Sequence, residues 1–115
     1  MNVVIIDYGA GNIQSVRFAL ARLGVTATLS DDVTTIKNAS HVIFPGVGEA
    51  SSAMEKLRAT GLDKLIPTLT QPVLGICLGM QLMCKHTEEG DTTGLGIFDT
   101  AVVRFKPILI FPHLV

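Results

Sequence analysis

The stretch "VLGICLGMQL", residues 73–82, places a cysteine between two glycines at the end of an apolar run. The run "PVLGI" (72–76) has the short apolar composition of a buried strand, and a helix is expected from Leu78 to about Lys85. A strand that turns sharply into a helix needs small residues on both sides of its central residue. The pattern therefore predicts a tight turn with Cys77 at its apex.

Cys77 at such a turn is a candidate nucleophile. The positive end of the helix macrodipole would favour its thiolate, and the N–H group of Leu78 would point to where a tetrahedral oxyanion forms. The alternative is an inert packing cysteine with incidental glycines. Cys84 has no flanking glycine and is expected to pack in the same helix. Two helical turns would place the Cα atoms of Cys77 and Cys84 about 10 Å apart, which is too far for a disulfide. Both thiols are therefore expected to be free, as in a reducing compartment.

On either side of this turn, the chain alternates between strand and helix patterns. Further strands are expected at "NVVIID" (2–7), "VTATL" (25–29) and "HVIFPG" (41–46), with late strands at "TAVVRF" (100–105) and "ILIF" (108–111) that could be antiparallel. Helical spacing covers 13–23 and 50–58, short helical turns end at Pro67, and 86–96 is polar and glycine-rich, typical of a loop. This order predicts an α/β fold with three αβα layers and a mostly parallel central sheet.

Three loops follow strands of this sheet. They are "DYGAGN" (7–12), "PGVGEA" (45–50) and "GICLG" (75–79). Ligands of parallel sheets bind beyond the carboxyl ends of the strands. We therefore expect the three loops to meet at one edge and to form the functional site there.

Composition excludes several classes of protein. The chain has 115 residues, 48% of them hydrophobic, which is enough for one small domain with a core. A formal net charge of −1 gives no attraction to nucleic acid or anionic membrane. The N-terminus lacks the pattern of a signal peptide or a membrane span, so a cytoplasmic location is expected. His41, His86 and His113 are too dispersed for a zinc site, and neither a metal nor a cofactor is expected.

Three motifs in this order resemble those of a known family. "GICLGMQ" (75–81) is similar to the nucleophile motif of the class I, triad-type glutamine amidotransferases, and "FPGVGEA" (44–50) to their oxyanion strand. The opening "IIDYGAGNIQSV" (5–16) is most similar to the glutaminase subunits of imidazole glycerol phosphate synthase, an enzyme of histidine biosynthesis. The resemblance identifies residues 1–115 as the N-terminal portion of a single amidotransferase domain, with the family's fold truncated.

The resemblance implies a role for individual residues. Cys77 would attack the side-chain amide of glutamine, release ammonia and form a glutamyl thioester that water hydrolyses. The backbone N–H groups of Leu78 and of Val47 or Gly48 would form the oxyanion hole. Gly46 and Gln81 would contact the bound glutamine. The "PGVG" peptide is expected to turn over before its N–H faces the substrate, a rotation that its glycines make sterically easy.

The resemblance also implies a partner. The first loop, at Gly11 and Asn12, would face a cyclase (synthase) subunit with a (β/α)8 barrel, which receives the ammonia through an internal passage. Glutamine is then the substrate, and no cofactor is needed.

The family's general base is expected to be missing. Class members use a histidine, oriented by a glutamate two residues later, near the end of a longer chain. "IFPHLV" (110–115) is similar to a mid-chain family segment whose histidine is not that base. We therefore expect the 115-residue chain alone to hydrolyse glutamine negligibly, because the loss of triad members lowers rates by orders of magnitude.

Three other interpretations compete with this one. "GAGNIQ" (9–14) with Asp31 partly matches a dinucleotide-binding fingerprint, but Gln14 stands where the third glycine belongs. A cysteine enzyme of the PfpI/DJ-1-like type also carries its thiol at a strand–helix turn, but that type does not account for Gln81. Lastly, the chain could be a non-catalytic, truncated subunit that docks on the synthase.

Overall fold

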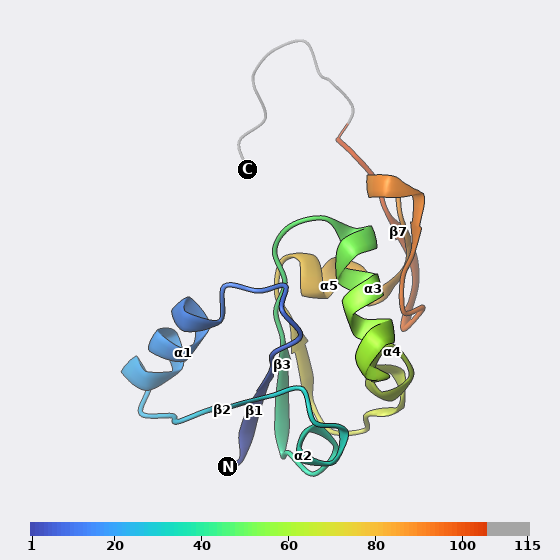
Figure 1. Ribbon diagram of the computed structural model, residues 1–115. Coiled ribbons are helices and arrows are strands. Elements are labelled where there is room, and N and C mark those ends of the chain that lie inside the picture. The colour runs from blue at the N-terminus through green and yellow to red at the C-terminus, as the bar shows by residue number, and fades with distance from the viewer. Residues whose placement is uncertain (106–115) are drawn as a thin grey trace, which may run out of the picture.

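The computed structural model describes residues 1–105, which form a central parallel sheet with helices on both faces (Figure 1). The sheet has the strand order β2-β1-β3-β4, and all of its pairs are parallel. Its strands are β1 (Val3–Ile6), β2 (Thr28–Ser30), β3 (His41–Phe44) and β4 (Val73–Gly75). All four residues of β1 are buried, as expected of a strand that is covered on both faces.

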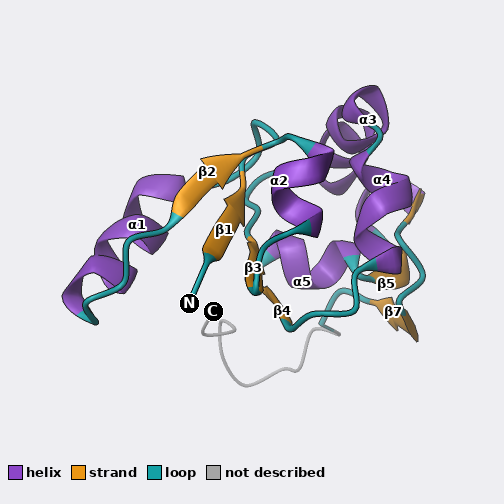
Figure 2. Cartoon of the chain, turned by 90° about the horizontal axis from the view of Figure 1, so that it is seen from below, coloured by secondary structure: helices purple, strands orange, loops and turns teal. Residues whose placement is uncertain are grey.

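The helices form the two outer layers (Figure 2). α1 (Ile13–Arg22) lies on one face of the sheet, and the other face carries α2 (Val33–Lys37), α3 (Ala50–Thr60), α4 (Leu62–Leu65) and α5 (Leu78–Leu82). Two 3₁₀ turns, η1 (Ile66–Thr68) and η2 (Glu89–Asp91), complete the helical segments of residues 1–105. The predicted three-layer α/β architecture is confirmed.

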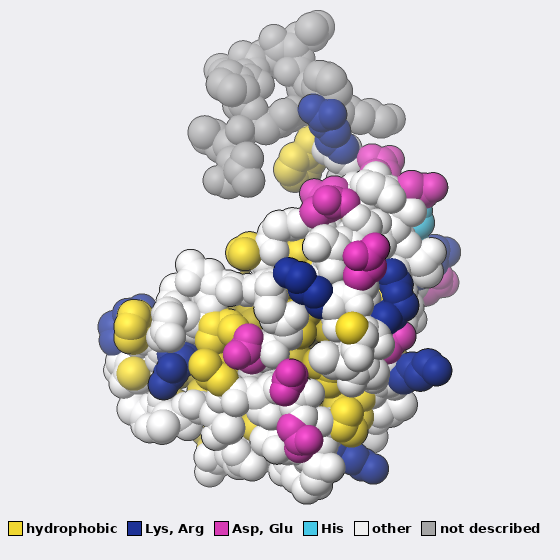
Figure 3. All heavy atoms as spheres, in the orientation of Figure 1, with side chains coloured by type: hydrophobic (Ala, Val, Ile, Leu, Met, Phe, Trp, Pro, Cys, Tyr) yellow, Lys and Arg dark blue, Asp and Glu magenta, His cyan; other side chains and the backbone are white. Residues whose placement is uncertain are grey.

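The two faces of the sheet are packed unequally. The larger core lies under α3, α4 and α5, and its fully buried side chains include Phe44, Leu57 and Leu82. The face under α1 buries only the side chains of Val3, Ile5 and Ile43, and α1 itself contains no fully buried residue. Apolar side chains accordingly reach the surface on the α1 side of the molecule (Figure 3).

A second, smaller sheet follows α5 and corrects the predicted helix. It has the order β6-β5-β7 and contains β5 (Cys84–Thr87), β6 (Thr92–Thr93) and β7 (Phe98–Val102). The helix expected up to Lys85 ends at Leu82, and the loop expected at 86–96 includes part of this sheet. The N–H groups of residues 94–98 donate to the carbonyls of residues 82–85 and hold this segment in the small sheet.

Other boundaries also differ from those expected. The second strand lies at 28–30 rather than 25–29, and the late strand at 98–102 pairs parallel, not antiparallel, with β5. The strand expected at 108–111, and the segment 110–115 with its histidine, lie outside the described residues. None of the helices in residues 1–105 combines the length and the apolar character needed to cross a membrane.

The turn before α2 has a side-chain cap. Asp32 accepts hydrogen bonds from the backbone N–H and the hydroxyl of Thr35, at 2.9 Å each. These hydrogen bonds hold the pKa of Asp32 below its usual value. Asp32 thus caps the N-terminus of α2.

Candidate functional site

The three loops predicted to converge do meet at the carboxyl edge of the large sheet. We call residues 7–12, 45–49 and 76–78 together the loop edge. The Tyr8 hydroxyl donates to the Pro45 carbonyl at 2.9 Å, and the Val47 N–H donates to the Ala10 carbonyl at 2.9 Å. These bonds join the first loop to the second. A third bond, described below, joins the second loop to the start of α5.

Cys77 lies at the apex of the turn between β4 and α5 and is exposed. Its backbone has φ 54° and ψ −123°, a conformation that residues other than glycine rarely adopt. The turn is held on both sides, because the Ile76 N–H donates to the Phe44 carbonyl at 3.0 Å and the Gln81 N–H donates to the Cys77 carbonyl at 3.1 Å. A strained residue fixed by its surroundings is a common feature of functional sites.

Gly79, two residues after Cys77, allows the backbone of α5 to approach the backbone of β3 closely. A Cβ atom on Gly79 would overlap the Phe44 carbonyl oxygen and lie 2.7 Å from the Phe44 carbonyl carbon. The start of α5 therefore packs directly on the end of β3. At Gly75, before the cysteine, a Cβ atom would lie 2.6 Å from the Met83 sulfur. Both glycines are thus required by packing, as the sequence pattern indicated.

Two of the three N–H groups considered for the oxyanion hole, those of Leu78 and Val47, are hydrogen-bonded within the protein. The Leu78 N–H donates to the Gly46 carbonyl at 3.1 Å, and the Val47 N–H is the group bonded to Ala10. The Gly46–Val47 peptide is therefore held by its oxygen and by its nitrogen. The third candidate, Gly48, is exposed with φ 102°, and a Cβ atom there would have no neighbour within 4 Å.

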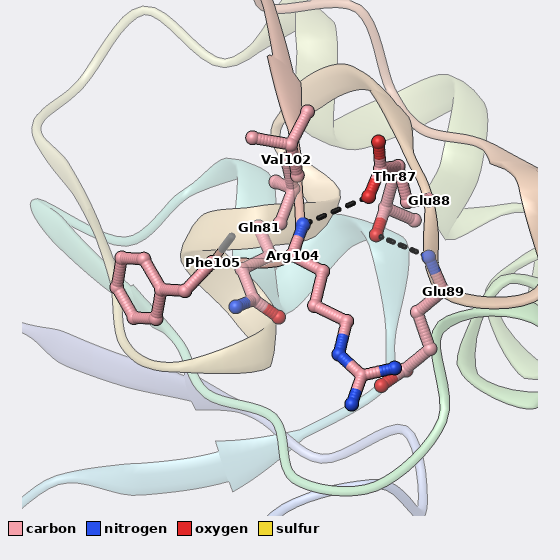
Figure 4. Close-up of a pocket in the computed structure, with 8 residues that line it drawn as sticks. Gln81, Thr87, Glu88, Glu89, Val102, Arg104 and Phe105 are labelled. Atoms are coloured by element: carbon pink, nitrogen blue, oxygen red, sulfur yellow. Dashed lines mark hydrogen bonds between the residues drawn. The ribbon is translucent and has the colours of Figure 1, made fainter. Parts of the chain in front are cut away.

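Gln81 lines a cavity of about 590 Å³ between α5 and the small sheet (Figure 4). Thr87, Glu88, Glu89, Arg104 and apolar side chains complete its lining. The side chains of Arg104 and Glu89 point toward one another (Figure 4). Cys77 does not line this cavity, but its carbonyl accepts the Gln81 N–H at 3.1 Å, so the two residues lie one turn apart.

Sequence reasoning missed two residues of this region. Glu89 lies in the segment interpreted as a loop, yet its carboxylate accepts a hydrogen bond from the Ala50 N–H at 2.8 Å and so tethers the start of α3. Tyr8 is only 6% exposed, and its ring lies 5.5 Å from that of Phe44. The only signal in the sequence was an aromatic residue immediately after a buried strand. No local spacing links either residue to its partner.

The described histidines do not form a relay with Cys77. His86 and Glu88 have the family's spacing of a histidine followed two residues later by a glutamate. However, the His86 ring lies 2.7 Å from the Asp91 carboxylate, and the Glu88 carboxylate accepts a hydrogen bond from the backbone N–H of Arg104. His41 is hydrogen-bonded to its neighbour Ser40. Within residues 1–105, no hydrogen bond joins a histidine to Cys77 and no cluster of three or more His, Cys, Asp or Glu side chains could hold a metal ion.

The remaining predicted residues lie where their loops place them. Gly11 packs near Pro45, since a Cβ atom on it would lie 3.3 Å from the proline ring, and Asn12 is exposed at the start of α1. Cys84 is buried at the start of β5, with its thiol 3.9 Å from the Met80 carbonyl. The prediction of two free thiols, with Cys84 in a packing role, is confirmed, although Cys84 lies on a strand and not on a helix.

The fold and this edge define the class of the protein. The glutamine amidotransferase class-I family matches residues 4–104, and the chain belongs to that family. A solved structure described as a glutamine amidotransferase superposes with a TM-score of 0.75 over 90% of this chain and 57% of its own, at 22% identity, and so shares the fold.

Relatives within the family carry a more particular name. Over 107 residues, 93% of this chain, it is 58% identical to the imidazole glycerol phosphate synthase subunit HisH of Bacteroides thetaiotaomicron. It is 47% identical to the subunit of the same name from Idiomarina loihiensis over 115 residues, 99% of this chain. It covers 55% and 59% of those two proteins. The chain therefore spans little more than half the length of these relatives.

Proposed function

We propose that the chain is the nucleophile-bearing portion of a glutaminase subunit that supplies ammonia to an imidazole glycerol phosphate synthase. The observation that carries this proposal is the exposed Cys77 thiol, held at φ 54° at the apex of the β4–α5 turn. The named relatives support the choice of synthase. Residues 1–115 then represent the N-terminal portion of one amidotransferase domain.

The reaction uses the sulfur as nucleophile. The Cys77 thiolate attacks the side-chain carbonyl carbon of glutamine, and the carbonyl oxygen becomes an oxyanion. The carbon–nitrogen bond then breaks, ammonia leaves with a proton from the general acid, and a glutamyl thioester remains. Water hydrolyses the thioester to glutamate and regenerates the thiol. Within residues 1–105 no histidine is hydrogen-bonded to Cys77, and His113 belongs to a segment similar to one whose histidine is not the base. We therefore expect the 115-residue chain alone to be inactive.

The oxyanion hole forms when the Gly46–Val47 peptide turns over. In its present orientation this peptide offers its oxygen to the Leu78 N–H. A turn of the peptide releases that N–H and brings the Val47 N–H to the same side, so that two donors face the developing charge. Two aligned donors lower the barrier for acyl transfer substantially. Gly46 lacks a side chain that would resist the rotation.

Glutamine binds with its α-carbon end in the cavity beside Gln81. Carboxylates at Glu88 and Glu89 suit an α-ammonium group, and Arg104 suits an α-carboxylate. Gly46 and Gln81 contact the substrate on the side nearer the sulfur. Because Gln81 lies one helical turn from Cys77, an amino acid anchored there can direct its side-chain amide toward the thiol.

The partner is the cyclase subunit, a (β/α)8 barrel that receives the ammonia. Gly11 and Asn12 of the first loop face it in this proposal. The first loop is hydrogen-bonded to the Gly46–Val47 peptide through Ala10. Docking of the barrel on this loop therefore acts on the peptide that must turn over, and activity depends on the partner.

The experiment measures ammonia and glutamate release by the complete reading frame that carries the chain, bound to the cyclase subunit. Cys77→Ala is expected to lower the rate by about 10³-fold or more, and the matched variant Cys84→Ala by less than about two-fold. Retention of activity by Cys77→Ala would contradict the proposal. So would equal losses for the two variants.

A further inference from the structure

Tyr8 belongs to the first loop of the loop edge and has a hydroxyl that the proposed chemistry does not yet use. Its hydroxyl donates to the Pro45 carbonyl at 2.9 Å, and its ring packs on Phe44 at 5.5 Å. A Cβ atom on Gly46 would lie only 2.6 Å from the hydroxyl oxygen. Burial raises the pKa of Tyr8 to about 12, so the hydroxyl remains a protonated donor throughout the neutral range.

The bond from Tyr8 restrains one peptide and does not involve the next one. The Pro45 carbonyl belongs to the Pro45–Gly46 peptide, directly before the Gly46–Val47 peptide. Turning over the second peptide changes ψ of Gly46 and φ of Val47, whereas the first peptide can stay in place. The Tyr8 hydroxyl therefore holds the fixed end about which the rotation takes place.

The same loop also carries the group that opposes the rotation. The Ala10 carbonyl, two residues after Tyr8, accepts the Val47 N–H at 2.9 Å. That bond must break when the peptide turns over, and the bond from Tyr8 need not. One short loop thus provides both a lasting anchor and a releasable contact.

We propose that Tyr8 is a positioning residue for the oxyanion hole, an assignment that rests on the glutaminase function proposed above. Its hydroxyl fixes the Pro45–Gly46 peptide, so that the Val47 N–H, once released by Ala10, points to one place beside the Leu78 N–H. Without the hydroxyl the anchor moves, and the released N–H samples several directions. A preorganised donor stabilises an oxyanion more than a mobile one does.

The test replaces Tyr8 by phenylalanine in the complete enzyme bound to its cyclase subunit. Tyr8→Phe keeps the ring on Phe44 and removes only the hydroxyl. We expect kcat for glutamine to fall about ten-fold while KM changes less than about two-fold, because the lost stabilisation belongs to the transition state. Alkylation of Cys77 by iodoacetamide needs no oxyanion hole, and its rate should stay within about two-fold of the wild type.

Amide hydrogen exchange on the same variant gives a readout that does not need turnover. The Val47 and Leu78 amides, whose partners depend on the anchored peptide, should exchange about ten-fold faster. The Ile76 amide, bonded to the Phe44 carbonyl at 3.0 Å, is the internal control and should keep its rate. An unchanged kcat with unchanged exchange overturns the proposal.

Two further outcomes separate the possible failures. If the Ile76 amide also exchanges ten-fold faster in Tyr8→Phe, the hydroxyl supports the fold in general and the positioning role is wrong. If the wild-type complex releases no ammonia, or Cys77→Ala retains activity, the proposed function fails, and the exchange pattern still decides whether Tyr8 anchors this peptide. A neutral Tyr8→Phe beside an inactive Cys77→Ala rejects the positioning role alone.

Discussion

The loop edge around Cys77 and the small sheet around Cys84 present the same chemical group in opposite ways. Cys77 is exposed with a positive φ, whereas Cys84 is buried at the start of β5. Both regions depend on a glycine packed against a carbonyl, Gly79 on Phe44 and Gly94 on Cys84. Close backbone packing is therefore common to the two regions and does not by itself mark a reactive thiol.

The difference between the regions lies in what holds each backbone. At the loop edge, hydrogen bonds from Tyr8, Val47 and Leu78 join segments that are far apart in sequence. In the small sheet, backbone bonds from residues 94–98 close a local loop over residues 82–85. The first arrangement holds a thiol outward at a strained residue, while the second encloses a thiol. Each of the following variants tests one part of this contrast.

The largest effect is expected for Gly79→Ala. Its methyl group would overlap the Phe44 carbonyl oxygen, and neither backbone can move without disturbing β3 or α5. We expect a loss of about 3 kcal/mol in the free energy of unfolding, the upper range for overpacking. The control, Gly96→Ala in the small-sheet region, meets no atom within 4 Å at φ 70° and should lose only about 1 to 2 kcal/mol. Equal losses would show that the close approach of Gly79 to Phe44 does not limit what fits at this position.

The next effect concerns pH and depends on Tyr8. Its pKa is raised from 10.0 to about 12 by burial, so folding favours the neutral phenol. The resulting stability is fully present below pH 10 and is lost as the pH rises toward 12, in total about 2 to 3 kcal/mol. The 115-residue chain has one tyrosine and no tryptophan, so its ultraviolet absorbance titration reports on Tyr8 alone. A midpoint near 10 in the folded chain would contradict the buried, donating hydroxyl.

A smaller effect, with opposite signs in the two regions, is expected from glycine substitutions. Cys77→Gly relieves the strain of φ 54° and should raise the free energy of unfolding by about 1 kcal/mol, while it removes the nucleophile. Cys84→Gly removes a buried side chain from a strand and should lower that free energy by about 1 to 2 kcal/mol. Urea titration of both variants measures the contrast, and a loss of stability in Cys77→Gly would contradict it.

The smallest effect is expected from the exposed ion pair of the small sheet. Lys85 and Asp99 lie 3.0 Å apart, with side chains 59% and 92% exposed. Solvent screens such a pair, so Asp99→Asn should change the free energy of unfolding by no more than about 0.5 kcal/mol. A loss above 1 kcal/mol in urea titration would mean that charge, and not backbone hydrogen bonding, holds β7 to β5.

Local pattern predicted much of the large sheet. The apolar runs at 2–7, 41–46 and 72–76 each contain an observed strand, because strands buried on both faces must be apolar throughout. The convergence of the three loops followed from parallel topology alone. The small sheet could not be predicted in the same way. Its β5 forms because the backbone N–H groups of residues 94–98 donate hydrogen bonds to the carbonyls of residues 82–85. The sequence pattern of residues 78–87 does not indicate that contact.

The candidate site likewise has local features that the sequence predicted and long-range contacts that it did not. Cys77 and its glycines form one continuous motif, so spacing was sufficient to locate the turn. Tyr8 and Pro45 are 37 residues apart, and Ala50 and Glu89 are 39 apart, so their hydrogen bonds depend on how the layers pack. The roles assigned to Gly46, Val47, Gly48, Leu78, Gln81, Gly11 and Asn12 remain predictions.

The most direct test of the central claim is covalent labelling of the native chain with a chloroketone analogue of glutamine, mapped by mass spectrometry. We predict that Cys77 is labelled and that Cys84 is labelled only after denaturation, because Cys77 is exposed at the loop edge and Cys84 is buried. Equal labelling of the two cysteines in the native chain, or labelling of Cys84 first, would contradict it.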